Sequence, residues 1–373
     1  MNYNLEKAYQ LHVKPAPDGG VFFTVVFKEN ASLSSVASSY AHVARLLKSA
    51  DFAVVQERIF GRLNVREEVL QIRNNALQEE LQPTYLEGTP VFRAPLAGML
   101  LRAAPSNIVS PLILDGQVVG KEWMSKKTRF AILGGVTGEG DTPAEETRSL
   151  LLRAFCIFSE AGFVPTDIAR TWFYLDDILS WYDAFNHARS GIFKSWGLMP
   201  TESSCELLLP ASTGIGVRNG FDQTVTADML LVQSAQPHNL VQQLTNPGQK
   251  DAFQYGSAFS RGAVIGSAEH RLLELSGTAS INERGETIHV NDPNAQIECT
   301  LEKIGQLLSL ENASLTQLSG GVAFCKDPSL AMPLQQSLKY RKIEMETFPL
   351  ICVEADVCRD DLLFELDGEL VID

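Results

Sequence analysis

Ala161-Gly-Phe-Val-Pro-Thr-Asp-Ile-Ala-Arg-Thr-Trp-Phe-Tyr-Leu-Asp-Asp177 is typical of a short loop followed by a strand, and it lies between an apolar helix near Leu150 and a second helix near Tyr182. The same helix–strand–helix pattern occurs over residues 40–75 and again over residues 301–338. Copies separated by roughly 110 to 150 residues are domain-sized units rather than the turns of a solenoid. The repeat therefore predicts three like units in one chain, with clefts where the units meet.

The composition is that of an ordinary globular protein. The chain has 373 residues, of which 45% are hydrophobic and 20% are charged. Its net charge of −14 argues against nucleic acid or an anionic membrane as the main partner, although a few arginines in a cleft would still admit a small anion. The first residues show no signal-peptide pattern, and no apolar run is long enough to span a bilayer. We therefore expect a cytoplasmic protein.

Four segments follow from the pattern. They are an N-terminal unit with an irregular loop region (1–127), a middle unit (128–235), a polar linker (236–256) and a C-terminal unit (257–373). The prolines between Leu81 and Lys127 predict loops and short edge strands there. Thr142 followed by Pro143 predicts the start of a helix.

Several kinds of site lack their motif. The glycine-rich stretch 134–140 has neither a phosphate-loop nor a dinucleotide-binding spacing, and the six histidines are isolated from one another and from cysteine. We therefore expect no metal and no cofactor. The six cysteines contain no Cys-x-x-Cys pair and are interpreted as buried free thiols.

The last two predicted strands carry carboxylates with period two. Glu354 and Asp356 share one strand face, and Glu365, Asp367 and Glu369 share another. A tight hairpin between these strands would place Glu354 opposite Glu365. In a partly dry cleft, the neighbouring charge and the loss of water both raise the pKa of a carboxyl group, which would make one of the pair a general acid. The alternative is a solvated acidic strand face.

The middle repeat resembles the RidA/YjgF family. The likeness rests on Gly135-Val-Thr-Gly-Glu-Gly-Asp-Thr-Pro-Ala-Glu-Glu-Thr, Arg170-Thr-Trp-Phe-Tyr-Leu-Asp-Asp-Ile, Tyr182-Asp-Ala-Phe-Asn-His-Ala-Arg and Pro210-Ala-Ser-Thr-Gly-Ile-Gly. RidA-like proteins are trimers that bind ligands at subunit junctions, and their imine deaminases use an Arg of a Pro-x-Arg-Ser-Cys motif and a Glu on the final strand. Glu365 matches that Glu. Ser203 and Leu350 occupy the position of the Arg, so imine hydrolysis fits less well.

The arrangement as a whole is similar to that of the chorismatases, which combine a diverged N-terminal part with a RidA-like C-terminal domain. Tyr255-Gly-Ser-Ala-Phe-Ser-Arg261 and Ser276-Gly-Thr-Ala-Ser280 carry this likeness. It implies an α/β (α+β) fold of RidA-like units repeated in one chain as a monomeric pseudo-trimer, with mixed sheets packed by helices. It also implies pyruvate release from chorismate without metal or cofactor, to give a dihydroxycyclohexadiene carboxylate or 3- or 4-hydroxybenzoate. The alternatives are a RidA-type imine or enamine hydrolase and a non-catalytic ligand-binding protein.

The chorismatase resemblance also implies roles for two acidic residues. Glu365 would protonate the enolpyruvyl methylene. Glu354 would keep Glu365 protonated or would only shape the pocket.

Two arginines and three further residues complete the expected site. Arg261 is the first choice for the substrate carboxylates, and Arg170 is the second because it begins an Arg-x-Trp-x-Tyr stripe that would wall the ring. The alternative for each arginine is a surface charge or a bridge between repeats. The remaining substrate-binding expectations are Tyr255, Gly277 and Ala279.

Overall fold

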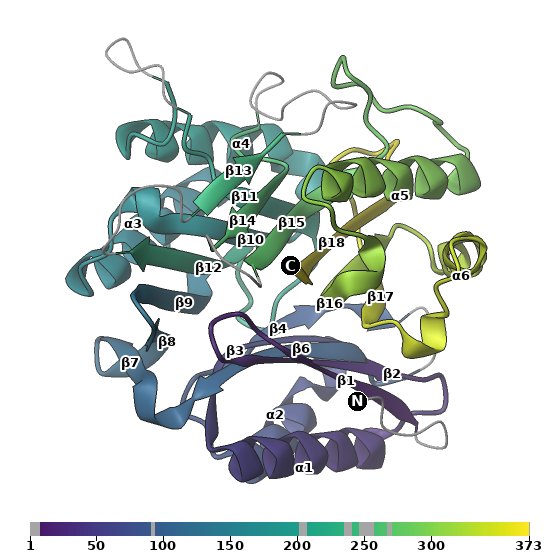
Figure 1. Ribbon diagram of the computed structural model, residues 1–373. Helices are drawn as coiled ribbons and strands as arrows, with labels where there is room; N and C mark the ends of the chain where they lie inside the picture. Colours follow the sequence, from purple (N-terminus) through teal and green to yellow (C-terminus); the bar gives the residue numbers. More distant parts are fainter. Residues whose placement is uncertain are drawn as a thin grey trace.

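The computed structural model describes residues 8–90, 94–200, 207–234, 241–245, 257–266 and 271–372. Three mixed β-sheets face the centre of the molecule, and helices cover their outer sides (Figure 1). The N-terminal unit comprises β1 (Tyr9–Pro15), β2 (Val21–Phe27), α1 (Leu33–Ala50), β3 (Phe52–Gly61), α2 (Arg66–Leu77), β4 (Thr84–Glu87) and β6 (Leu96–Pro105).

The other two units contain the same elements. The middle unit comprises β8 (Gln117–Ser125), β9 (Thr128–Thr137), α3 (Pro143–Glu160), β10 (Ile168–Leu175), α4 (Ile178–Ser195), β11 (Ala211–Gly216) and β12 (Val225–Ser234). The third unit comprises β14 (Gly262–Ile265), β15 (Arg271–Ala279), α5 (Pro293–Ser309), β16 (Leu318–Cys325), α6 (Ala331–Tyr340), β17 (Leu350–Glu354) and β18 (Phe364–Ile372). Three further strands lie at sheet edges: β5 (Thr89–Pro90), β7 (Val109–Leu114) and β13 (Val241–Leu244).

All three units share one topology. In each, the chain runs β-β-α-β-α-β-β, and the last strand inserts between the second and the third, as in β1-β2-β6-β3-β4, β8-β9-β12-β10-β11 and β14-β15-β18-β16-β17. The third and fourth strands of each unit are parallel, and a helix connects them. The predicted threefold repetition and the α/β pseudo-trimer are therefore confirmed.

The sheets differ from what the sequence predicted for its segments in three places. β7 and β8 precede residue 128 but pair with β9 of the middle sheet. β6, in the proline-rich stretch, is a central ten-residue strand rather than an edge strand, because Pro95 and Pro105 fall at its two ends and leave its interior free to pair. Within the expected linker 236–256, Val241–Leu244 forms β13 and pairs with β14.

Apolar side chains gather in four clusters. Three lie between each sheet and its own helices, and a fourth lies where the three sheets face one another. β10 shows the cause: Phe173 and Leu175 point to the helices of the middle unit, whereas Trp172 and Tyr174 point to the central cluster. A strand that is buried on both faces needs apolar side chains throughout.

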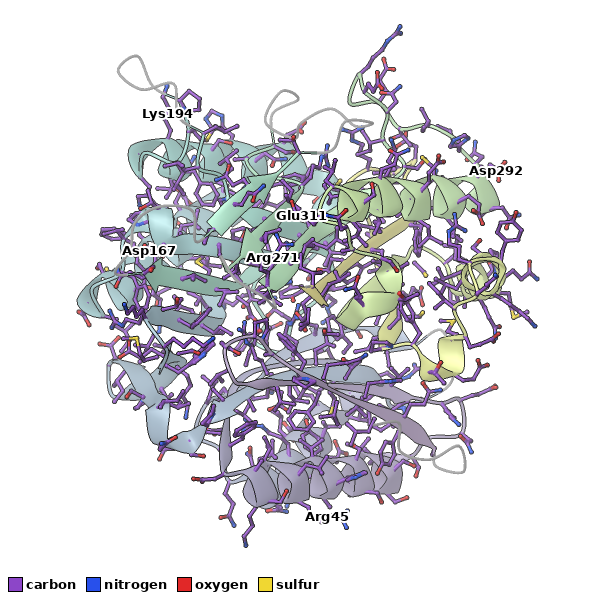
Figure 2. The ribbon with its side chains drawn as sticks, in the orientation of Figure 1. Arg45, Asp167, Lys194, Arg271, Asp292 and Glu311 are labelled. Atoms are coloured by element: carbon purple, nitrogen blue, oxygen red, sulfur yellow. The ribbon has the colours of Figure 1, made fainter. Side chains whose placement is uncertain are left out.

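Helix ends follow the sequence signals. Thr142 caps α3 by accepting a hydrogen bond from the backbone N–H of Glu145 at 3.3 Å, with Pro143 at the first helical position, as predicted. Asp292 caps α5 in the same way, and Lys194 lies in the last turn of α4 (Figure 2).

Within the described residues, no helix combines the length and the apolar character needed to cross a membrane.

Candidate active site

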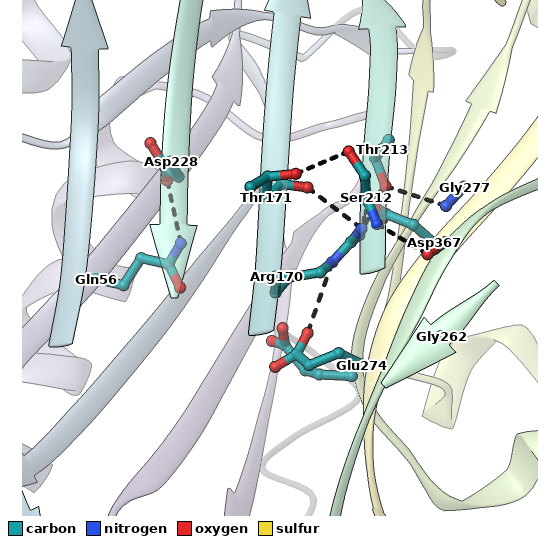
Figure 3. A network of polar contacts seen from close by, with 12 residues as sticks. Gln56, Arg170, Thr171, Ser212, Thr213, Asp228, Gly262, Glu274, Gly277 and Asp367 are labelled. Atoms are coloured by element: carbon teal, nitrogen blue, oxygen red, sulfur yellow. Dashed lines mark hydrogen bonds and ion pairs between the residues drawn. The ribbon is translucent and has the colours of Figure 1, made fainter. Parts of the chain in front are cut away.

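A pocket lies where the middle and third units meet. β11 of the middle unit runs beside β15 of the third, and a bulge in β15 between Leu275 and Thr278 turns its backbone toward β11. The Ser276 hydroxyl accepts a hydrogen bond from the backbone N–H of Ser212 at 2.9 Å, and the backbone N–H of Gly277 donates to Thr213 Oγ1 at 3.1 Å. The Ser-Gly-Thr-Ala-Ser stretch of the sequence therefore joins the two units at this point (Figure 3).

Both units contribute to the lining of this pocket. Its interior volume is about 30 Å³, within a larger empty space of about 490 Å³ that includes open solvent at its mouth. The lining residues are Tyr182, Arg189, Ser212, Gly214, Ser257, Phe259, Arg261, Gly277, Ala279, Ile281, Cys358, Arg359 and Glu365. Glu365 is the one carboxylic acid among these lining residues, which also include three arginines.

Glu365 is held on the floor of the pocket by β18. It lies opposite Ala279 of β15 and Phe324 of β16, and only 5% of its surface is exposed. A side chain at position 277 would put its Cβ 1.9 Å from Glu365 Oε1, so Glu365 would have to shift to accept it. Burial raises the pKa of Glu365 to about 8, and the negative charge of Asp367 adds to this, while Arg170 and Arg261 oppose it. At neutral pH the group is mostly a neutral acid that can donate a proton.

Three buried or partly buried arginines give the pocket its positive charge. Arg261, predicted from the sequence, is 2% exposed and lies 5.4 Å from the ring centroid of Phe259. Arg189 on α4 donates to Asn186 Oδ1 at 2.7 Å, and Arg359 donates to the backbone carbonyl of Gly285 at 2.8 Å. Their guanidinium groups reverse, within the pocket, the sign of the molecule's net charge of −14.

Sequence reasoning missed Arg189, Arg359, Tyr182 and Cys358. Tyr182 and Arg189 lie in a stretch that carries the RidA-like resemblance, and Arg359 lies just before the last strand, but none of the three was singled out as a site residue. Burial raises the pKa of Cys358 to about 12, so its sulfur is a neutral thiol beside Glu365.

Five cysteines are described and all are free, but Cys156 is exposed rather than buried as predicted, because it lies on the outer side of α3. Cys205 lies outside the described residues.

The comparisons by sequence and by fold both find similar proteins that are named as chorismatases or a hydroxybenzoate synthase. No protein-family model matches the chain. It is 26% identical over 254 residues to a chorismatase of Streptomyces rapamycinicus, covering 62% of this chain and 71% of that protein. It is also 26% identical over 249 residues to a 3-hydroxybenzoate synthase of Streptomyces hygroscopicus, covering 60% and 68%. A chorismatase crystal structure superposes with a TM-score of 0.65 at 20% identity, covering 85% of this chain and 92% of that one.

The chain resembles the chorismatases in both sequence and fold. This confirms the resemblance that its sequence motifs indicated. The pocket lies at a junction between two units of one chain, as the repeat predicted. Among the described residues, no cluster of three or more His, Cys, Asp or Glu side chains is arranged to hold a metal ion.

Glu354 is not a partner of Glu365, and the predicted hairpin is wrong. β16 lies between β17 and β18, because β17 pairs with it in parallel and β18 pairs with its other edge. The loop after β17 therefore crosses β16 instead of turning back on itself. Glu354 is exposed at the end of β17, opposite Cys325 and outside the lining of the pocket.

Arg170 also lies outside the pocket lining. Its side chain is fully buried and forms an ion pair with Asp367 at 3.0 Å, and its stripe with Trp172 and Tyr174 faces the central cluster. The Trp172 ring is contacted by two guanidinium groups, those of Arg58 at 4.4 Å and Arg170 at 4.7 Å, and it does not line the pocket. Gly277 and Ala279 line the pocket as expected, whereas Tyr255 lies outside the described residues.

The acid occurs at one of three corresponding positions in the repeat. Glu365 pairs with the second-last residue of β16, and the residues that pair in the same way in the middle and N-terminal units are Thr226 and Gly98. A second pocket, between the third and N-terminal units, is lined by Leu350 and Cys352, which correspond to Ser212 and Gly214. Of these three described positions, the one at the junction of the middle and third units therefore carries the acid.

Proposed function

We propose that this protein is a chorismatase, which releases pyruvate from chorismate. The observation that carries the proposal is the buried carboxyl group of Glu365, mostly protonated at neutral pH, in a pocket lined by three arginines. The named chorismatase and hydroxybenzoate synthase relatives support the same substrate.

The charge pattern of the pocket fits this substrate. Chorismate carries two carboxylates, one on its ring and one on its enolpyruvyl ether. Arg261, Arg189 and Arg359 supply positive charge from three different elements, so two anionic groups some distance apart can be bound together. Arginine binds a carboxylate through paired N–H donors, which also fixes its orientation.

Glu365 acts as the general acid. Its proton passes to the terminal methylene carbon of the enolpyruvyl group, whose carbon–carbon double bond becomes a single bond, and positive charge develops on the ether carbon as an oxocarbenium ion. Attack by water, or displacement of the ether by the neighbouring ring hydroxyl, then breaks the link to the ring and releases pyruvate. A positioned general acid contributes roughly 10²–10⁴-fold to such a step.

The ring product belongs to one of three classes. Attack by water leaves a dihydroxycyclohexadiene carboxylate. Attack by the ring hydroxyl leads, after rearomatisation, to 3- or 4-hydroxybenzoate, and the sum of that product and pyruvate equals chorismate without added water.

A coupled assay tests the proposal. Purified protein is mixed with chorismate, pyruvate is followed with lactate dehydrogenase and NADH, and the ring product is identified by chromatography against the three standards. We expect pyruvate and one ring product in equal amounts, at rates that fall above about pH 8 as Glu365 loses its proton. No pyruvate above the spontaneous background would overturn the proposal.

A further inference from the structure

A second carboxylate lies directly behind the acid. Asp367 follows Glu365 by two residues on the same face of β18, is 2% exposed and does not line the pocket. Its Oδ2 atom is 3.0 Å from Arg170 Nη2 and accepts a hydrogen bond from Thr213 Oγ1 at 2.7 Å. Both partners belong to the middle unit, so Asp367 ties the strand that carries the acid to the opposite side of the junction (Figure 3).

The Thr213 hydroxyl is saturated by this arrangement. It donates to Asp367, and it accepts from Arg170 Nη2 at 2.6 Å and from the backbone N–H of Gly277 at 3.1 Å. A hydroxyl group has one donor and two acceptor sites, and all three are used. Since Gly277 packs against Glu365 Oε1, a continuous chain of contacts runs from the Arg170–Asp367 ion pair to the floor of the pocket.

We propose that Asp367, fixed by Arg170 and Thr213, is a positioning residue that keeps Glu365 in its acid form and in place. Arg170 then serves to hold Asp367 and does not bind the substrate. This inference rests on the proposed function for its kinetic test, but its titration test is independent of any substrate.

Several charged or titratable groups lie near Glu365, and their effects on its ionisation oppose one another. The negative charge of Asp367 disfavours ionisation of Glu365, whereas Arg170 and Arg261 favour it. The other such groups that line the pocket are Arg189 and Tyr182 from α4, and Cys358 and Arg359 from the loop before β18. Asp367→Asn removes the opposing negative charge and leaves Arg170 with its ion pair to Glu274 at 3.8 Å. The loss of the Asp367 charge favours ionisation of Glu365.

The middle unit offers a matched control. Asp228 stands at the position of the repeat that corresponds to Asp367. It is equally buried and accepts hydrogen bonds from Thr84, Gln56 and the backbone N–H of Gly135. Asp228→Asn should therefore destabilise the fold in a comparable way without acting on Glu365.

The first experiment compares pH–rate profiles of the wild type, Asp367→Asn and Asp228→Asn with chorismate. We expect Asp367→Asn to move the alkaline limb down by about one pH unit or more, with KM within about threefold of the wild type, and Asp228→Asn to leave the limb in place. A limb unchanged in Asp367→Asn, or a loss of kcat that is the same at every pH, would overturn the inference.

A titration without substrate separates the inference from the proposed function. Infrared spectra show the carbonyl band of a protonated carboxyl group, and the band missing in Glu365→Gln belongs to Glu365. It should disappear at lower pH in Asp367→Asn than in the wild type. If this shift occurs but chorismate is not converted, the proposed function fails and the inference stands. If chorismate is converted without the shift, the inference fails alone.

A second pair of variants serves if Asp367→Asn does not fold. Thr213→Val removes the shared hydroxyl at nearly constant volume and should lower kcat by about 3–10-fold with KM nearly unchanged, as expected for the loss of one hydrogen bond. Thr213→Ser keeps the hydroxyl and should restore kcat. Equal kinetics for the two variants would overturn the positioning role.

Discussion

At the scale of single residues, the proposed site combines one buried carboxyl group with positively charged surroundings. Glu365 is kept mostly neutral by burial and by the charge of Asp367, even though Arg170 and Arg261 pull its pKa in the opposite direction. The loss of hydration outweighs the attraction of the arginines. The result is an acid that can protonate carbon near neutral pH.

Replacing the acid should stop the reaction. Glu365→Gln keeps the size and the hydrogen-bonding ability of the side chain but cannot release a proton, so pyruvate release from chorismate should fall at least about 10²–10⁴-fold with folding intact. Glu354→Gln is the control, because its exposed carboxyl group lies outside the pocket, and its rate should stay within about twofold of the wild type. Substantial activity in Glu365→Gln would show that the acid lies elsewhere.

Removing one arginine should weaken substrate binding. Arg261→Ala loses a charge-assisted hydrogen bond, which costs roughly 1.5–3 kcal/mol, and should raise KM for chorismate about 10–150-fold. Arg218→Ala, which removes a surface guanidinium that is 57% exposed, should leave KM unchanged. Steady-state kinetics decide the matter, and an unaltered KM in Arg261→Ala would indicate a purely structural role.

The raised pKa of Glu365 also makes a stability prediction. Between the ordinary value of 4.5 and about 8, the folded state keeps a proton that the unfolded chain has lost, so the contribution of Glu365 to stability falls as the pH rises through this window. The free energy of unfolding of Glu365→Gln, relative to the wild type, should therefore rise from about pH 5 to about pH 8 and then level off. Urea unfolding at several pH values measures it, and a difference independent of pH would contradict the assigned shift.

At the scale of secondary-structure elements, the bulge in β15 shapes the site. The bulge frees the backbone of Ser276 and Gly277 from regular pairing with β18 and turns it toward β11. The strand thereby makes a junction between units and leaves room for the carboxyl group of Glu365.

A methyl group at Gly277 should disturb the acid. Gly277→Ala places Cβ 1.9 Å from Glu365 Oε1, so Glu365 must move, with a loss of stability of about 1–3 kcal/mol and a fall in kcat of at least about tenfold. Gly305→Ala in α5 is the control, because its Cβ meets nothing within 4 Å and alanine favours a helix by about 0.5–1 kcal/mol. Thermal melts and kinetics of both variants test this, and full activity in Gly277→Ala would refute the close contact.

At the scale of the whole molecule, three units of one chain close around a common core. β11 contacts β15, β3 and β4 contact β9, and β16 and β17 contact β2, so each unit touches both others. Because the three junctions can diverge separately in a single chain, the acid occurs at one of them while Thr226 and Gly98 stand at the corresponding positions.

The closed ring predicts a monomer. All three junctions are satisfied within one chain, which leaves no junction for another copy to fill. Sedimentation velocity should give a single species near 41.0 kDa over a wide range of concentration. An obligate trimer of the full chain would contradict this prediction.

The sequence by itself determined the repeated units, the strand and helix patterns, the helix start at Thr142 and the place of Glu365 on one face of the last strand. These features depend on local periodicity, on capping chemistry and on a motif in one strand, all of which can be seen along the chain. Arg261, Gly277 and Ala279, which the sequence also singled out, line the pocket, and they lie in short stretches that resemble a known family.

Only the tertiary structure decided which groups meet. Glu354 appeared to oppose Glu365 because consecutive strands are often paired, but β16 lies between them. Arg170 appeared available to a substrate, but the fold buries it beside Asp367, and Arg189 and Arg359 reach the pocket from elements far apart in the chain. Residue spacing fixes the face of a strand on which a side chain lies, whereas the order of strands and the packing of units fix what that side chain contacts.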